Sequence, residues 1–448
     1  MKFELTQQYM NDLVKLIDHQ DNSALEELLS PLHPADIAEI LDEAALEQAQ
    51  YIYRLLDSEK ASDVLVELDA DVKNKFLASL TNSEIADQVE HMETDDATDF
   101  IQDLSPERQG EILSNIDDIE LSEDIAKLLN YEEDTAGALM ATEFICAQTD
   151  WTIGDALMNL REQAEEIDHV YTIYTIDEHK RLKGTLSLKT FLYSDNDTKI
   201  EAVHNPDFIS VKATANDSEV IKLMDKYDLV VLPVVNEIGI LIGRITIDDV
   251  VDAMREDAER DMQLATGVSE KIESKDSPWV ITRARIPWLF IGMVGGVLGA
   301  LVIGNFEGQL GKFPELAFFI PLIAAMGGNV GVQSSALIVQ GLANNTLMND
   351  KTASKILKEL VVALINGAIL SVILFLYTLA IGSGLNLCLT VSISLFSVII
   401  LSGIMGTFVP LILNRYKIDP ALATGPFITT LNDVLGLLLY FYIGYLFY

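Results

Sequence analysis

Long apolar stretches dominate the last third of the chain. A helix that crosses a bilayer needs about 20 predominantly apolar residues, and five stretches of that length follow Pro287 with short polar connectors between them. The pattern therefore predicts a multi-pass membrane domain over residues 277–448. Its five expected spans are residues 286–306, 316–342, 358–382, 387–413 and 424–447.

The first 132 residues show a different pattern. Short apolar blocks at helical spacing recur after polar turns, and no stretch alternates as a strand would. Asp36, Asp63 and Asp87 occupy similar places in successive blocks, at irregular intervals. Recurring helices of about a dozen residues form superhelical stacks when each buries one face against its neighbours. Residues 1–132 are therefore predicted to be an all-α superhelical domain.

From residue 137 the pattern changes to mixed α and β. Two units of about 64 residues can be superposed, so that the apolar run 170–176 matches the run 229–235. Each unit reads as strand–helix–strand–strand–helix, which predicts a tandem α+β module over residues 137–252. A helix over residues 253–276 is expected to connect this module to the membrane domain.

The charge is divided as sharply as the hydropathy. Only six of the 69 acidic residues and eight of the 30 basic residues lie beyond residue 277, so the front part has a net charge of −41 and the membrane part +2. A strongly acidic surface repels nucleic-acid phosphates and anionic lipid headgroups, and it attracts cations. A solubilising surface is the alternative explanation. The two cysteines, Cys146 and Cys388, offer neither a disulfide framework nor a Cys-based metal site.

The flanks of the spans predict the orientation in the membrane. Residues 1–10 lack the apolar core and cleavage site of a signal peptide, so the N-terminus is expected to stay in the cytoplasm. Basic residues then concentrate on the inner flanks, as the positive-inside rule requires, and five spans place the C-terminus outside the inner or plasma membrane. The inner flanks carry Arg283, Arg285, Lys351, Lys355, Lys358, Arg415 and Lys417, and the outer flanks carry Lys312.

The second span is unusually polar. Asn329, Gln333 and Gln340 fall at positions i, i+4 and i+11 of a helix and so share one face. Gly327 and Gly328 permit a close approach of backbones, or a local break whose carbonyls face a water-filled path. A polar stripe that only bonds neighbouring helices together is the alternative.

The fifth span contains a carboxylate, Asp433, whose face it shares with Pro426 and Thr430. No other acidic residue lies as deep within a predicted span, and no Lys or Arg lies at a comparable depth to pair with it. A charge at the bilayer centre costs ~3 kcal/mol, so an unpaired intramembrane carboxylate is by default a functional site. A cation that moves past Asp433 is the natural partner, and a protonated Asp used only for packing is the alternative.

The groups around Asp433 favour a hard cation. Mg²⁺ prefers oxygen ligands and keeps several of its waters while one or two carboxylates hold it. One carboxylate per chain, with threonine hydroxyls, an asparagine amide and freed backbone carbonyls, fits such a hydrated ion. If two chains met on a two-fold axis, two copies of Asp433 would face a single ion. The spans contain no His, which argues against soft metals.

These residues resemble the signature of the MgtE family of magnesium channels. The resemblance lies in Gly327-Gly328-Asn329-x-Gly331-x-Gln333 and, near the fifth span, in Asp419-Pro420-Ala421, Gly425-Pro426, Thr429-Thr430 and Asp433. It implies a homodimer with a central pore, in which the two copies of Asp433 are the selectivity carboxylates and Asn329 lines the pore. Val332 departs from relatives that carry a second amide there. The candidate pore residues are Asp433, Asn329, Thr430, Gly328, Gln333 and Asp419.

Two groups of acidic residues lie near the predicted domain junctions. Asp95 and Asp99 fall within about one helical turn, and a second group runs from Asp248 to Asp261 along the last helix of the module and the segment after it. Like charges at these spacings repel, and divalent cations between the two groups would remove the repulsion. This predicts a sensor that packs the domains together at high internal Mg²⁺ and releases them at low Mg²⁺. A solvated acidic face is the alternative.

The family resemblance assigns the sensing role to particular positions. They are Asp95, Asp99, Asp249, Asp252, Asp257 and Asp261, and Glu256 and Glu259 are further candidate metal ligands. Arg260 stands where relatives carry an acid, so one ion site is expected to be missing or weaker. In the family, the helix over residues 253–276 is a gating helix that lies over the cytoplasmic pore mouth. The N-terminal domain likewise resembles the family's superhelical domain.

The tandem module resembles a pair of CBS domains, a regulatory fold that often binds adenine nucleotides. The second unit keeps Thr246-x-x-Asp249, the place where such modules hold a ribose, whereas the first has Ser187-x-x-Thr190 and lacks the acid. A nucleotide such as ATP would therefore bind mainly at Thr246 and Asp249. A module that binds no nucleotide is the alternative.

Together these features predict a Mg²⁺-selective, Mg²⁺-gated homodimeric channel of the cell membrane, with no enzymatic activity. The expected fold is multi-domain: an all-α superhelical N-terminal domain, an α+β tandem CBS module and a five-helix transmembrane domain. Three other functions remain open. A broader divalent-cation transporter would also pass Co²⁺, Ni²⁺ or Mn²⁺. An intramembrane enzyme would need a Ser–His or His–Glu pair, which the spans lack. A nucleotide-sensing receptor with an inert membrane anchor would have no use for Asp433.

Overall fold

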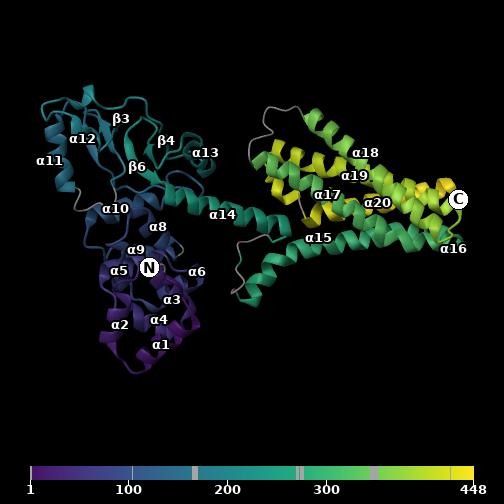
Figure 1. Cartoon of the computed structure of the whole chain (residues 1–448), viewed down its shortest axis with the longest axis horizontal. Coiled ribbons are helices and arrows are strands. Elements are labelled where there is room, and N and C mark those ends of the chain that lie inside the picture. The colour runs from purple at the N-terminus through teal and green to yellow at the C-terminus, as the bar shows by residue number, and fades with distance from the viewer. Residues whose placement is uncertain are drawn as a thin grey trace. The chain divides into compact units, whose positions relative to one another are not determined.

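The computed structural model describes residues 3–102, 104–163, 170–268, 272, 277–343, 352–423 and 425–448. The chain divides into two compact units, Met1–Arg255 and Glu256–Tyr448, and Figure 1 shows the elements of each. The first unit holds an array of short helices and a mixed α/β module, and the second holds the long apolar helices. The multi-domain fold expected from the sequence is confirmed.

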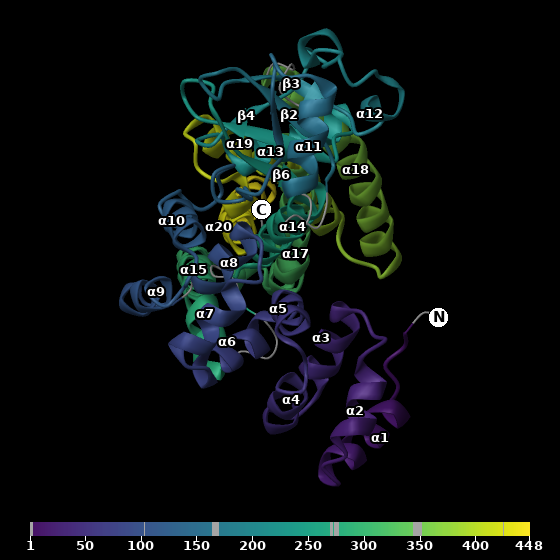
Figure 2. The same cartoon turned by 90° about the vertical axis from the view of Figure 1, so that its left-hand side faces the viewer.

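Short helices form the N-terminal array (Figure 2). They are α1 Gln7–Asp18, α2 Asn22–Leu29, α3 Pro34–Glu43, α4 Leu46–Tyr53, α5 Ser58–Val66, α6 Ala70–Ser79, α7 Asn82–Val89, α8 Thr94–Gln102, α9 Pro106–Leu113 and α10 Ile119–Leu128. Helix α3 packs against α5, α5 against α7, and α7 against α9. Stacking of this kind produces a superhelix, and Figure 2 shows the helices following a curved path. The all-α superhelical array is therefore as predicted.

Polar caps determine where many of these helices begin. A helix leaves its first backbone N–H groups without partners, and a side-chain oxygen just before it can accept from one of them. Such caps are provided for α1, α2, α5, α7 and α9 by Thr6, Asp21, Asp57, Thr81 and Ser105.

Two basic side chains close the ends of earlier helices. Lys60 Nζ donates to the carbonyls of Leu29 and Ser30 at the end of α2. Arg108 Nη2 donates in the same way to Leu77 and Leu80, near the end of α6. Both pairs of contacts join residues about 30 positions apart. The same type of contact therefore recurs along the array, in agreement with the loose internal repeat in the sequence.

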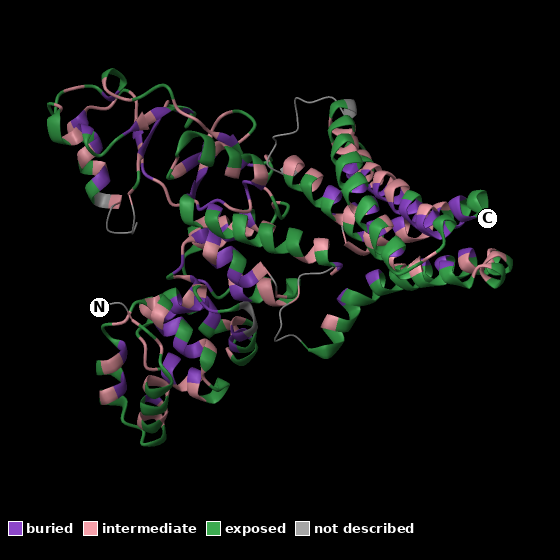
Figure 3. Ribbon diagram, turned by 45° about the vertical axis from the view of Figure 1, so that its right-hand side comes forward, coloured by how far each residue is buried: buried purple, intermediate pink, exposed green. Residues whose placement is uncertain are grey.

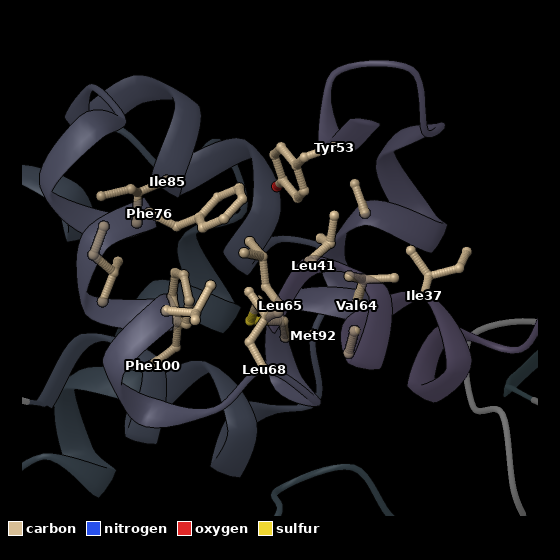
Figure 4. Packing of buried hydrophobic residues seen from close by; sticks show 14 of the residues in the cluster. Ile37, Leu41, Tyr53, Val64, Leu65, Leu68, Phe76, Ile85, Met92 and Phe100 are labelled. Atoms are coloured by element: carbon tan, nitrogen blue, oxygen red, sulfur yellow. The ribbon is translucent and has the colours of Figure 1, made fainter. Parts of the chain in front are cut away.

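One continuous apolar core runs through the array (Figure 4). Leu65, Phe76 and Phe100 are almost completely buried and come from three different helices. Tyr53 and Phe76 meet edge to face, with ring centroids 5.3 Å apart. Each short helix therefore contributes one face to a shared core, which is why none of them needs to be stable alone.

Two three-stranded sheets with the same topology form the mixed module. The first contains β1 Cys146–Gln148, β2 Ile173–Ile176 and β3 Leu182–Leu186, and the second β4 Val211–Lys212, β5 Val231–Val235 and β6 Leu241–Thr246. In each sheet the first pair of strands is parallel and the second pair is antiparallel. The parallel pairs are joined through α11 Ile153–Gln163 and α13 Asp217–Tyr227. The shared topology confirms the predicted duplication.

The two units of the module end differently. The first ends in a single turn of helix, α12 Thr190–Tyr193, followed by the short η1 Ile200–Ala202. The second ends in α14 Ile247–Thr266, so its closing helix and the predicted connecting helix are one continuous element. Helix α14 stops ten residues before the predicted end of the connector, because Gly267 takes a left-handed conformation with φ +87° that terminates helices. Of the predicted connector, residues 269–271 and 273–276 lie outside the described residues.

Five helices of the second unit are long and apolar enough to cross a membrane, as predicted. They are α15 Pro278–Asn305, α17 Ile320–Ala343, α18 Thr352–Ala380, α19 Leu385–Arg415 and α20 Gly425–Phe447, with the short α16 Glu307–Lys312, η2 Pro314–Phe319 and η3 Pro420–Ala423 between some of them. Helix α15 begins eight residues earlier than expected and so includes Arg283 and Arg285. The predicted inner-flank residue Lys351 lies outside the described residues.

Burial is uneven among the five long helices. Helix α19 is the most buried of them and contacts α17, α18 and α20, whereas much of α15 and α18 is exposed along the outer side (Figure 3). Exposed apolar side chains are what a helix needs where it faces lipid. The bundle is therefore built around α19, with the apolar outer faces available to the bilayer.

Candidate ion site and acidic clusters

Helices α17 and α20 bring two of the predicted pore residues together. A Cβ atom at Gly328 on α17 would lie 3.6 Å from Oδ1 of Asp433 and 3.0 Å from Cγ2 of Thr429, both on α20. Thr429 uses its hydroxyl to donate to the carbonyl of Gly425, which turns its methyl group toward α17. The Asp433 carboxylate thus lies beside the glycine-rich stretch of α17, and it is only partly buried in the single chain.

A neighbouring contact fixes the same two helices. Asn432 is 1% exposed, and a Cβ atom at Gly331 would overlap its side-chain amide. Neither Nδ2 nor Oδ1 of Asn432 has a hydrogen-bond partner in the part of the chain that the structure describes. An asparagine amide was among the predicted ligands, but Asn432 was not among the candidate pore residues. Its place directly before Asp433 in an apolar run was the available signal.

The other candidate pore residues lie in three settings. Asn329 and Gln333 are exposed on α17, so the predicted polar stripe lies on the surface of the single chain. Thr430 faces α15, where a Cβ atom at Gly295 would overlap its methyl group. Asp419 lies before η3 and accepts a hydrogen bond of 2.8 Å from the backbone N–H of Ala421. The structure therefore brings Gly328 to Asp433, but turns Thr430 toward another helix.

A second carboxylate lies inside the membrane-spanning bundle. Glu359 falls within the candidate span Ser354–Ala380 and accepts a hydrogen bond of 2.5 Å from the hydroxyl of Ser334 on α17. Asp433 was predicted to be the one acidic residue deep within a span, with Glu359 at the edge of the third span. Helix α18 begins at Thr352, six residues before the predicted start of the third span, so Glu359 lies about two turns from the start of the helix.

An acidic cluster lies inside the first unit, where α8 meets the mixed module. Burial raises the pKa of Asp95 well above its ordinary value, and the nearby charges of Asp249, Asp96 and Glu93 raise it further. Burial and the charge of Asp249 raise the pKa of Asp96 to about 7. The pKa of Asp249 is also raised, chiefly by burial. The structure thus brings Asp95 and Asp249 together, as predicted from the sequence.

A basic residue and a hydrogen-bond network hold α8 beside the module. Arg244 on β6 is 4% exposed, and its Nη2 forms an ion pair of 2.7 Å with Glu93, just before α8. Glu143 accepts from both the backbone N–H and the hydroxyl of Thr94, at 3.1 and 3.0 Å. Neither Arg244 nor Glu93 was a candidate in the sequence analysis. The acidic cluster is therefore partly neutralised by a built-in cation.

The proposed ribose-binding pair is engaged within the protein. Both the backbone N–H and the hydroxyl of Thr246 donate to Oδ2 of Asp249, at 2.9 and 2.5 Å. The carboxylate of Asp249 therefore accepts from the residue just before α14, as an acid in the first turn of a helix often does, and it lies near Asp95. Asp249 is thus a candidate both for nucleotide binding and for Mg²⁺ sensing.

A second acidic cluster lies in the other unit, near the end of α14. Burial raises the pKa of Asp261, and the charges of Asp419 and Asp257 raise it further. Arg260 forms an ion pair of 3.5 Å with Asp257, so the residue that departs from the family pattern neutralises one of the acids. The remaining sensor candidates, Asp99, Asp252, Glu256 and Glu259, are exposed.

The end of α14 also touches the start of α20 within the second unit. A Cβ atom at Gly267 would lie 2.8 Å from Cγ of Pro426 and 3.5 Å from Cβ of Trp288. A Cβ atom at Gly425, which has φ +55°, would overlap the carbonyl oxygen of Ala265. The last turn of α14 therefore packs directly on the entrance of the helix that carries Asp433.

Three parts of the chain match known families. Residues 32–134 match the MgtE intracellular N domain, residues 136–196 and 200–256 match CBS domains, and residues 320–443 match the MgtE divalent cation transporter. The chain is also 33% identical over 432 residues to the magnesium transporter MgtE of Thermus thermophilus, with 96% of each chain covered. This chain belongs to the MgtE family.

Other relatives of this MgtE chain agree. The magnesium transporter MgtE of Bacillus subtilis is 30% identical over 415 residues, which cover 92% of each chain. A structure of the cytosolic domain of the Mg²⁺ channel MgtE in complex with ATP resembles 55% of this chain and is covered over 99% of its own length, with a TM-score of 0.51 and 32% identity. The soluble part of a magnesium transporter resembles 56% of this chain, with 98% of its length covered, a TM-score of 0.51 and 27% identity.

These matches confirm the resemblance on which the sequence analysis relied. The protein is a member of a family of magnesium transporters, which is not a class of enzymes, and the matched families include a pair of CBS domains. Among the described residues of this MgtE protein, no group of three or more His, Cys, Asp and Glu side chains is arranged to hold a metal ion. The described carboxylates meet in smaller groups, such as Asp95 with Asp249.

Proposed function

We propose that this MgtE protein is a Mg²⁺-selective channel in which Asp433 is the selectivity carboxylate. The observation that carries the proposal is the position of Asp433, partly exposed on a membrane-spanning helix and beside Gly328 on α17. A carboxylate at this depth is costly unless a cation or another partner compensates it. A single carboxylate suits Mg²⁺ that keeps most of its waters.

The pore is formed by two chains. Asn329 and Gln333 are exposed on the same helix as Gly328, although amides gain nothing from contact with lipid. A second copy of this chain would cover that stripe and would bring a second Asp433 to the same ion. Apolar side chains on the CBS module also favour a homodimer, because Leu192 is 86% exposed and Tyr193 is 70% exposed.

Cytosolic Mg²⁺ closes the channel. The charge of Asp249 raises the pKa of Asp95, so repulsion between the two carboxylates opposes the packing of α8 on the module unless a cation or protons neutralise them. Helix α14 starts at this interface and ends against Pro426 and Gly425, so it is suited to carry the change to α20. Asp261 and Asp419 form a further acidic pair at that end. The ion pair of Arg260 with Asp257 weakens one ion site there.

ATP is a further ligand of the CBS module. A solved relative is the cytosolic domain of an MgtE channel in complex with ATP, and Thr246 with Asp249 is the pair expected to hold the ribose. Because Asp249 also faces Asp95, ATP and α8 would compete for the same carboxylate.

The N-terminus lies in the cytoplasm and the C-terminus outside. When the five helices alternate in direction, the basic helix ends share one side of the bilayer. These ends carry Arg283 and Arg285 in α15, Lys358 in α18 and Arg415 in α19. The positive-inside rule assigns that side to the cytoplasm.

Flux through liposomes tests the pore. We expect purified wild-type protein to pass Mg²⁺, and Asp433→Ala to lower the flux at least about tenfold, since a binding contribution of ~1.4 kcal/mol is a factor of ten. Glu307→Gln, which alters an exposed acid between α15 and α17, is the matched control. Liposomes with wild-type protein that leak no more Mg²⁺ than empty ones would exclude the proposal.

Ion competition distinguishes the broader alternative. The family that matches residues 320–443 is described as a divalent cation transporter, so Mn²⁺, Co²⁺ and Ni²⁺ deserve the same assay. A Mg²⁺-selective pore passes them far more slowly than Mg²⁺, whereas equal fluxes would make the protein a general divalent transporter.

A second assay tests gating. Asp249→Ala combined with Asp252→Ala should leave the channel open when Mg²⁺ on the cytosolic side is high. The control variant Asp225→Ala changes an exposed position of α13. Its channel should close at high Mg²⁺ as the wild-type channel does. If Mg²⁺ inhibited the double variant as strongly as the wild type, the sensor would have to lie elsewhere.

A further inference from the structure

A contact across three helices joins α18 to the ion pathway. Glu359 on α18 accepts the hydrogen bond of Ser334 on α17 at 2.5 Å, although α18 packs mainly against α19. Ser334 is 3% exposed and Glu359 is partly buried, so this hydroxyl–carboxylate pair lies between the helices. The pair is therefore an internal link between two helices that otherwise meet little.

Two glycines of α19 make this link possible. A Cβ atom at Gly403 would lie 3.3 Å from Oε1 of Glu359, and one at Gly406 would lie 2.9 Å from Cβ of Ser334 and 2.5 Å from the carbonyl oxygen of Gly331. A larger residue at either position would push α18 or α17 away. The backbone of α19 therefore leaves the space through which Glu359 reaches α17.

Packing alone does not account for an acid at this position. A carboxylate within a membrane span carries an insertion cost that an apolar side chain of similar size avoids. A hydrogen bond to a carboxylate is stronger than one between neutral groups, and in a partly buried site it helps to fix both partners in one geometry. The neighbouring segment of α17 needs such a fixed geometry, because it carries Gly328 beside Asp433.

The segment of α17 between Gly328 and Ser334 is held from two sides. Gly328 and Gly331 lie against Asp433 and Asn432 of α20, and Ser334, one turn further on, is bonded to Glu359. We propose that Glu359 is a positioning residue of the pore: through Ser334 it holds α17 in the register that places Gly328 beside Asp433. This inference rests on the proposed function of Asp433.

Flux of Mg²⁺ and Mn²⁺ through liposomes that contain the full chain tests the proposal. Glu359→Ala and Ser334→Ala should each lower Mg²⁺ flux about tenfold, the scale of a hydrogen bond to a charged group. Combining them should cost little more than either alone, because both remove one interaction. Glu359→Gln keeps an acceptor oxygen at the same reach and should recover most of the flux, whereas Glu359→Asp, one methylene shorter, should not.

The ratio of Mg²⁺ to Mn²⁺ flux separates positioning from simple loss of folded protein. A shift of α17 changes the site beside Asp433 and so changes the ratio, whereas fewer folded channels lower both fluxes equally. Ser394→Ala is the matched control, because Ser394 is completely buried on α19 and its hydroxyl has no partner within the described part of the chain. It should leave the ratio unchanged.

Three results would overturn the inference while wild-type protein still conducts. The first is unchanged flux and ratio in both alanine variants. The second is a loss of Mg²⁺ flux that is as large in Glu359→Gln as in Glu359→Ala, while Ser334→Ala conducts normally. That result would mean that the charge of Glu359 itself binds the ion. The third is an equal fall in both fluxes at constant ratio. If wild-type protein conducted no Mg²⁺ at all, the proposed function itself would be wrong.

Discussion

Asn432 fills the space that Gly331 leaves on the facing helix. The contact is so close that any Cβ atom at position 331 would overlap the Asn432 amide, which is buried and has no hydrogen-bond partner within the described residues. Two helices that meet through a glycine approach closely, as is common in membranes. The close approach buries the amide of Asn432, and it holds Asp433, the next residue, beside α17.

Adding one methyl group at this contact should separate the helices. We expect Gly331→Ala to lower the free energy of unfolding by about 1–3 kcal/mol, the usual cost of overpacking, as measured by thermal unfolding in detergent. Asn432→Ala in the same chain should restore most of the loss, because it removes the group that the methyl meets. Additive losses in the double variant would show that the two residues do not share the contact.

The room beside Asp433 should limit the size of residue 328. A Cβ atom at position 328 would lie 3.0 Å from Cγ2 of Thr429 and 3.6 Å from Oδ1 of Asp433. The valine of Gly328→Val would therefore displace the Asp433 carboxylate, and we expect Mg²⁺ flux in liposomes to fall at least about tenfold. Gly296→Val on α15 is the control, because nothing lies within 4 Å of a Cβ atom there. A Gly328→Val channel that conducts like the control would move the pore away from this face of α17.

The gross architecture was predictable because each part of the chain has a strong local pattern. Five apolar stretches of spanning length strongly favour a chain that crosses a bilayer. Each predicted span corresponds to one long helix of the structure: α15, α17, α18, α19 and α20. The duplication of the module was readable because β2 and β5 repeat the same apolar run. The early end of α14 was not foreseen, although Gly267 is a common type of helix terminator.

The detailed site depended on contacts between distant parts of the chain. The ion pair of Arg244 with Glu93 joins residues 151 positions apart, and no local pattern indicates it. Glu359 was overlooked because its place in the bundle depends on where α18 begins. Thr430 and Asp433 are three residues apart on α20, yet Thr430 contacts α15 and Asp433 contacts α17. Which neighbour each side chain meets depends on the helices that surround α20. Asp95 and Asp249 were found because clustered like charges are a local signal.

A buried hydroxyl at the other end of α20 should support stability without affecting transport. Tyr440 is 1% exposed and donates a hydrogen bond of 2.7 Å to the carbonyl of Leu316. Tyr440→Phe removes the donor, so we expect the free energy of unfolding in detergent to fall by about 1 kcal/mol while Mg²⁺ flux stays close to wild type. Tyr442→Phe, at an exposed position of α20, should change neither quantity. A large loss of flux in Tyr440→Phe would extend the functional region to this end.

Protons should replace Mg²⁺ at the interface between α8 and the CBS module. The pKa of Asp96 is raised to about 7, and the pKa values of Asp95 and Asp249 are raised by burial, so the packed state binds more protons than a state in which these acids face water. By linkage, packing is favoured as the pH falls and is opposed as the pH rises above these raised values. Without Mg²⁺, we therefore expect the backbone amides of α8 to exchange more slowly at pH 6 than at pH 8, after correction for intrinsic rates.

The same acids determine how Mg²⁺ binding depends on pH. Mg²⁺ must displace the protons that the raised pKa values retain, so Mg²⁺ should protect α8 in the full chain more strongly at pH 8 than at pH 6, relative to the Mg²⁺-free protein at each pH. Asp96→Asn removes one titrating group and should reduce the pH dependence of exchange, while Asp225→Asn on the exposed side of α13 should not. Exchange of α8 that is independent of pH in the Mg²⁺-free wild type would mean that these carboxylates do not change protonation when α8 packs. Slower exchange at pH 8 than at pH 6 without Mg²⁺ would mean that packing releases protons, which is the opposite of the prediction.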